Sequence, residues 1–147
     1  MTSMNSMNRF TKEELEKISI REIMGEKAYF YYSTIEDFIL EDAYVLRQGV
    51  CDSFALALHD EFGYEGWYIE EPCHYFCSAV RNGKKYYIDA MGICNDLNTL
   101  LDRPGVTEDD LLPQDFEKTR EFKEYLGREG YEFSKEFIKK YRRYYQI

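Results

Sequence analysis

The pattern of hydrophobic and polar residues along the chain alternates between helical and extended segments. Thr11 and Glu14 have the spacing of a capping box, and apolar residues follow them at helical intervals. This pattern predicts a helix from Thr11 to Met24. The same signals predict a second helix over about 33–46.

The third predicted helix begins at a cysteine. Gly49 interrupts the chain just before this helix, and Gly63 ends it. Cys51 stands at the expected N-terminus and also at the first position of an apolar stripe. The stripe consists of Cys51, Phe54, Ala55, Leu58 and Phe62.

Beyond this helix the hydrophobic period becomes that of a strand. A short strand at about 67–70 is followed by two alternating runs joined by Asn82-Gly83. Asn-Gly is a strong hairpin signal, because a type I′ turn needs positive φ at both central positions. We expect the hairpin to extend from His74 to Asp89.

The turn also sets the register of this hairpin. With Asn-Gly in the turn, His74 faces Met91 and Asp89 faces Phe76, and all four side chains share one face. His74 and Asp89 become diagonal neighbours, about 6–8 Å apart between their α-carbons. Their side chains are therefore expected to lie within reach of each other.

The C-terminal third is predicted to be helical. Loop and short helical turns fill 94–114, and helices at about 115–126 and 132–145 flank a turn at 127–130. The last helix carries the apolar residues Phe133, Phe137, Ile138, Tyr141 and Tyr145 at helical spacing. Helices packed on one side of a small antiparallel sheet define an α+β fold, expected here as a single domain over 1–147.

Three residues of the predicted fold suggest nucleophilic catalysis. A helix N-terminus and a protonated His74 would both stabilise a thiolate at Cys51. Asp89 would accept a hydrogen bond from one imidazole nitrogen and leave the other facing the sulfur. Cys51, His74 and Asp89 therefore form a candidate nucleophile–base–orienter triad.

An oxyanion site is expected beside the cysteine. Main-chain N–H groups of Cys51 or Asp52, at the start of the helix, would hold the oxygen of a tetrahedral intermediate. Gln48, three residues before the cysteine, is a further candidate donor through its side-chain amide. It is equally compatible with a solvated position in the preceding loop.

Three sequence segments, taken in order, resemble the papain-like superfamily. They are Gly-Val-Cys-Asp-Ser-Phe-Ala-Leu-Ala-Leu, His-Tyr-Phe and Tyr-Tyr-Ile-Asp-Ala-Met-Gly. The nearest pattern is that of small bacterial and phage members related to cell-wall amidases and transglutaminases. The resemblance spans 48–92, with a helical extension at about 115–145, and assigns nucleophile, base and orienter to Cys51, His74 and Asp89. It implies a papain-like domain that transfers an acyl group from an amide or ester to water or an amine. The resemblance is compatible with a peptidase, amidase, deamidase or transglutaminase that acts on a protein or peptide. Such an enzyme could be a bacterial or phage effector.

Other interpretations of the same residues remain open. Cys51 could be a buried core residue, the His74–Asp89 contact could be structural, and His59 could be an alternative base. Strand alternation separates His74 from Cys73 and Cys77, which are expected in the core, and no second ligand pair is present. We therefore expect no metal site, and no motif predicts another cofactor.

Composition narrows the class of partner. A net charge of −9 argues against binding to duplex nucleic acid or to an anionic membrane. No segment has the pattern of a signal peptide or a membrane span, so a cytoplasmic protein with reduced cysteines is expected, of undetermined oligomeric state. The 14 tyrosines and 10 phenylalanines suggest a rival function. In that reading the chain is a non-catalytic, acidic, tyrosine-rich protein that binds and blocks a protein partner.

Overall fold

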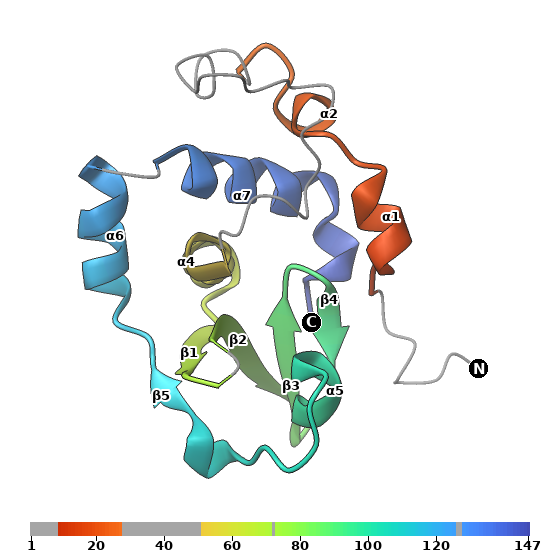
Figure 1. Ribbon diagram of the computed structural model, residues 1–147, viewed down its shortest axis with the longest axis vertical. Helices are drawn as coiled ribbons and strands as arrows, with labels where there is room; N and C mark the ends of the chain where they lie inside the picture. Colours follow the sequence, from red (N-terminus) through yellow and green to blue (C-terminus); the bar gives the residue numbers. More distant parts are fainter. Residues whose placement is uncertain (1–8, 28–50, 72, 126–127) are drawn as a thin grey trace.

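The computed structural model describes residues 9–27, 51–71, 73–125 and 128–147. Helices and a sheet form separate layers (Figure 1). The helices are α1 (Lys12–Glu16), α2 (Ile20–Met24), α4 (Cys51–Phe62), α5 (Leu97–Leu101), α6 (Phe116–Tyr125) and α7 (Arg128–Lys140), with short 3-10 turns at Glu108–Asp110 and Arg142–Tyr144. The strands are β1 (Glu65–Ile69), β2 (His74–Arg81), β3 (Lys84–Asp89), β4 (Gly92–Cys94) and β5 (Leu112–Pro113).

The sheet is antiparallel throughout and has the order β4-β3-β2-β1-β5. The β2–β3 hairpin has the predicted turn, with φ of 54° at Asn82 and 77° at Gly83. Its register is also the predicted one, because Cys77 pairs with Ile88 and Arg81 pairs with Lys84.

Each face of the sheet is buried, but by different elements. On one face, Cys77 and Ile88 pack with Phe54 and Leu58 of α4 and with residues of α7. Figure 1 shows α4 lying between the sheet and α7. On the opposite face, where alternation places Phe76, short α5 and the loop after it form a second, smaller core.

The α+β class is therefore confirmed, with the longer helices covering one face of the sheet. Helix α4 begins at Cys51 and ends at Phe62, before Gly63 with a φ of 77°. Its middle, from Ser53 to Leu58, is buried all round because α7 covers the side away from the sheet.

The N-terminal prediction was right about the cap and wrong about the length. Thr11 and Glu14 form the expected capping box, but α1 stops at Glu16. Ser19 and Glu22 form a second capping box that begins α2. Because Ser19 offers its own cap, the chain makes two short helices instead of one.

Two further boundaries differ from expectation. The predicted turn at 127–130 is wrong for 128–130, because α7 already begins at Arg128. Strand β5 falls within the segment predicted to be loop, and β4 ends where that segment begins, at Cys94; both strands are too short to show a period. The predicted helix at 33–46 lies outside the described residues.

Candidate active site

Cys51 is the first residue of α4, and its side chain is half-buried. The sulfur is hydrogen-bonded by the side chain of His74 and by the main chain of Tyr75. Since the helix start is packed against the beginning of β2, three local features meet at this sulfur. They are a helix N-terminus, an imidazole and a strand N–H.

His74 is the first residue of β2 and links Cys51 to Asp89. Its Nε2 lies 3.1 Å from Oδ2 of Asp89, which leaves Nδ1 for the hydrogen bond with Cys51. The hairpin register predicted this cross-strand contact, because β2 and β3 bring the two residues together near the strand ends.

Asp89 ends β3 and is held in place on both of its oxygens. While Oδ2 accepts from His74, Oδ1 accepts the main-chain N–H of Met91 at 2.9 Å. Asp89 is only 5% exposed, and Nη1 of Arg9 lies 3.7 Å from Oδ1. A carboxylate fixed in this way can fix the imidazole ring in turn.

The three residues favour charge separation between sulfur and imidazole. Burial alone raises the pKa of the Cys51 thiol, but hydrogen bonds from His74 and from the Tyr75 main chain, together with the His74 charge, lower it overall. Burial alone lowers the pKa of His74, but hydrogen bonds to Asp89 and Cys51 raise it to about 9. Both shifts favour a thiolate–imidazolium pair over a neutral thiol and imidazole, and the thiolate is the nucleophilic form of cysteine.

The first turn of α4 also contains the predicted oxyanion residues. Asp52 follows the thiol directly, and its Oδ1 accepts the N–H of Ser53 at 2.8 Å. The Asp52 charge raises the pKa of Cys51 and so opposes the effect of His74. Gln48, the other predicted donor, lies outside the described residues.

Two residues that support the site were missed in the sequence. Nε2 of Gln114 donates to the main-chain oxygen of Asp52 at 3.2 Å, which ties the segment after β5 to the start of α4. Arg9 donates to the main-chain oxygen of Gly92 at 3.1 Å as well as approaching Asp89. Both contacts join distant parts of the chain, and no local pattern marks either residue.

The remaining cysteines lie apart from this arrangement. Buried Cys77 donates its thiol to the main-chain oxygen of Ala55, and Cys94 donates to that of Asp96. Cys73 precedes β2 and is exposed, so its predicted place in the core is wrong. Among the described residues no group of three or more His, Cys, Asp or Glu side chains could hold a metal ion.

His59 has a structural environment of its own. It lies eight residues after Cys51 on α4, a separation of about 12 Å along the helix axis. Its Nδ1 is 2.8 Å from the main-chain oxygen of Tyr64, and its ring stacks on Phe116 with centroids 4.2 Å apart. These contacts place it away from the Cys51 sulfur and explain its position without a catalytic role.

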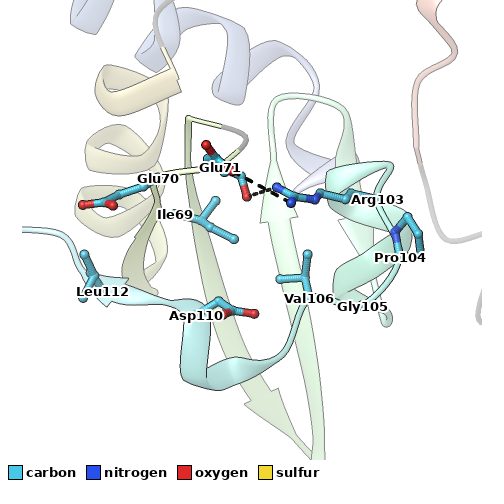
Figure 2. Close-up of a pocket in the computed structure, with 9 residues that line it drawn as sticks. All are labelled: Ile69, Glu70, Glu71, Arg103, Pro104, Gly105, Val106, Asp110 and Leu112. Carbon is cyan, nitrogen blue, oxygen red and sulfur yellow. Dashed lines mark hydrogen bonds and ion pairs between the residues drawn. The ribbon is translucent and has the colours of Figure 1, made fainter.

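A hollow of about 530 Å³ lies beside the end of β1 (Figure 2). Its walls come from the end of β1, the loop after α5 and the beginning of β5. Arg103 reaches across it and donates to the main-chain oxygen of Glu71 at 2.6 Å. None of the three triad candidates lines this hollow, so it is separate from the thiol.

Comparisons with protein-family models, with curated proteins and with solved structures give no match to this chain. Within the described ranges, no helix combines the length and apolar character needed to cross a bilayer. The function of the site is therefore argued from its geometry and chemistry.

Proposed function

We propose that this protein is a cysteine-dependent acyl-transfer enzyme in which Cys51 attacks, His74 transfers the proton and Asp89 orients His74. The observation that carries the proposal is the continuous hydrogen-bonded chain from sulfur through imidazole to a buried carboxylate. Each member comes from a different element, α4, β2 or β3, so the chain depends on the tertiary fold.

The geometry suits a two-step reaction. The Cys51 thiolate attacks the carbonyl carbon of an amide or ester, a C–S bond forms, and the carbonyl electron pair moves to oxygen. Main-chain N–H groups of Cys51 and Asp52 at the helix start would stabilise that oxyanion. The His74 imidazolium then gives its proton to the leaving nitrogen or oxygen, whose bond to carbon breaks, and a thioester remains.

The second step regenerates the pair. Neutral His74 takes a proton from water or an amine, which attacks the thioester carbon and releases the thiolate. Asp89 keeps Nδ1 of His74 directed at the sulfur in both steps by holding Nε2. Water as acceptor makes the protein a peptidase, amidase or deamidase, and an amine makes it transglutaminase-like.

The resemblance to the papain-like superfamily, stated on the sequence around the same three residues, agrees with the proposal. The order of cysteine, histidine and aspartate along the chain, with a cysteine leading a helix and the other two on adjacent strands, is the order that the resemblance implies. A protein or peptide substrate, and an effector role in a bacterium or phage, remain part of the proposal on this ground alone.

An activated ester tests the proposal directly. After brief exposure to p-nitrophenyl acetate at neutral pH, peptide mapping should find an acetyl group on Cys51 that hydroxylamine removes. Cys51→Ala should lose both the acetyl group and the initial burst of p-nitrophenol. The matched control Cys73→Ala, a change at an exposed cysteine, should keep both.

One result would favour the rival function. Acetylation spread evenly over Cys51, Cys73 and Cys94, with no burst, would show that Cys51 has no special reactivity. The chain would then be better described as an acidic, tyrosine-rich binding protein that blocks a partner.

A further inference from the structure

A pair of tyrosines stands beside the Cys51 sulfur. Tyr68 of β1 and Tyr75 of β2 are direct cross-strand partners, and their ring centroids are 4.6 Å apart at an angle of 31°. Both side chains are partly exposed. The main chain of Tyr75 is hydrogen-bonded to Cys51, so the pair adjoins the thiol directly.

The position of the pair follows from strand alternation. Tyr75 projects to the same face as Cys77, the face that α4 covers further along the strand. Gly66 and Cys77 pair two positions further from the thiol end of the sheet, under the helices. The tyrosines therefore lie where α4 begins and leave part of their rings accessible.

Two acidic side chains of the described residues act on the tyrosines. Burial raises the pKa of Tyr75, and the charges of Asp52, Cys73 and Cys51 raise it further. The pKa of Tyr68 is raised first by its hydrogen bond to Cys73, and Glu70 adds to the effect. Asp52 and Glu70 thus bring negative charge to the tyrosine pair from two different elements.

Arg103, a basic residue beside the turn after β1, is directed toward Glu71. Figure 2 shows Arg103 reaching toward Glu71, while Glu70 points away from both. Arg103 is held by the main-chain oxygen of Glu71 and lies 4.0 Å from its carboxylate. Glu71 is therefore the acidic partner of Arg103, whereas the charge of Glu70 acts on Tyr68.

Faces of aromatic rings next to carboxylates attract cations. The ring quadrupole places negative charge on the face, and a desolvated ammonium or guanidinium gains from both ring and carboxylate. A neutral apolar group would gain from the rings but not from Asp52 and Glu70. An anionic group would be repelled by both acids.

We propose that Tyr68 and Tyr75, flanked by Asp52 and Glu70, form a subsite that binds a basic side chain of the substrate, of the lysine or arginine class, next to the acyl group attacked by Cys51. This inference rests on the proposed function and adds the substrate class. Binding of the basic group positions the carbonyl at the sulfur, so positive charge should raise the rate of attack.

Matched alkylating probes separate charge from size. The chloroacetyl amides of lysine amide, Nε-acetyl-lysine amide, norleucine amide and glutamate amide react with thiolates through the same group. We expect the lysine probe to modify Cys51 about tenfold faster than the acetyl-lysine probe, with the glutamate probe slowest. Each rate is divided by that of iodoacetamide on the same protein, which removes differences in thiol reactivity.

Variants and salt locate the source of the preference. Tyr68→Leu and Asp52→Asn should each reduce the lysine preference severalfold, whereas Phe122→Leu, a change of an exposed aromatic residue on α6, should keep it. High salt should weaken the preference in the unaltered protein, because it screens partly exposed charges. The salt measurement needs no variant to fold.

The results distinguish failure of the basic subsite from failure of the proposed enzyme function. Equal rates for all four probes, or a fastest reaction with the norleucine probe, would overturn the basic subsite and leave the proposed enzyme intact if iodoacetamide still prefers Cys51. If iodoacetamide shows no preference for Cys51 over Cys94, the proposed function fails, and the subsite fails with it.

Discussion

Nε2 of His74 lies 3.1 Å from Oδ2 of Asp89, across two neighbouring strands and next to the thiol of Cys51. This hydrogen bond serves both residues. Asp89 is a buried carboxylate that needs a donor, and the imidazole gains a fixed ring orientation and a raised pKa. The remaining nitrogen is thereby directed to the sulfur.

Asp89→Asn should separate orientation from stability. The amide keeps the shape of the carboxylate and can still accept from the Met91 N–H, so the fold should persist. The imidazole loses its anionic partner and its preferred tautomer, and kcat for acyl transfer should fall about a hundredfold to ten-thousandfold.

The exposed residue Asp109 provides the control, because Asp109→Asn makes the same chemical change at a surface side chain outside the triad. Activity within a factor of two of the unaltered protein is expected there. If Asp89→Asn retained full activity on a substrate that Cys51→Ala cannot process, His74 would need no orienting carboxylate.

The protonation of His74 should depend on both of its partners. NMR titration of the His74 ring should give a pKa of about 9. In Cys51→Ala, and separately in Asp89→Asn, the pKa should decrease, because each variant removes one of the hydrogen bonds that raise it. A His74 pKa near the ordinary value of about 6.5 in the unaltered protein would contradict the ion pair.

The same shift has a consequence for stability. Folding raises the pKa of His74 from 6.5 to about 9. The contribution of His74 to the free energy of unfolding is therefore fully present below about pH 6.5 and is lost as the pH rises through 9. Urea unfolding should show the largest difference between the unaltered protein and His74→Gln near pH 6. This difference in the free energy of unfolding should decrease toward pH 10. A difference that increases toward pH 10 would contradict a raised His74 pKa.

Gly66 permits the close approach of α6 to the sheet. A Cβ built at this position would lie 2.1 Å from Cζ of Phe116, whose ring is also stacked on His59. Gly66→Ala should therefore lower the free energy of unfolding by about 1–3 kcal/mol.

A double-mutant cycle tests the cause. Phe116→Leu shortens the side chain, so Gly66→Ala should cost less in that background than alone. Equal costs in both backgrounds would mean that Phe116 is not the obstacle.

Much of the site was predictable because its geometry depends on local signals. Asn82-Gly83 fixes the hairpin register, and the register brings His74 to Asp89. In the sequence, Gly49 and Gly63 bracket an apolar helical pattern, and α4 does begin at Cys51. These signals act over a few residues, where turn and helix chemistry determine the backbone.

The supporting contacts were not predictable for the opposite reason. Gln114 reaches Asp52 across 62 residues, and Arg9 reaches Gly92 across 83 residues. Neither contact has a periodic pattern in the sequence. The Tyr75 main-chain contact with the sulfur is independent of side-chain identity, so no residue type could have indicated it.

The most direct test of the central claim is the order in which the cysteines react. A short pulse of iodoacetamide at about pH 6, followed by peptide mapping, should label Cys51 first, because its thiolate is stabilised by His74. Cys77, buried and with a raised pKa, should react last. His74→Gln should slow labelling of Cys51 about tenfold or more, and leave exposed Cys73 unchanged. If Cys51 reacts no faster than Cys73, or reacts equally fast in His74→Gln, the thiolate–imidazolium pair does not exist.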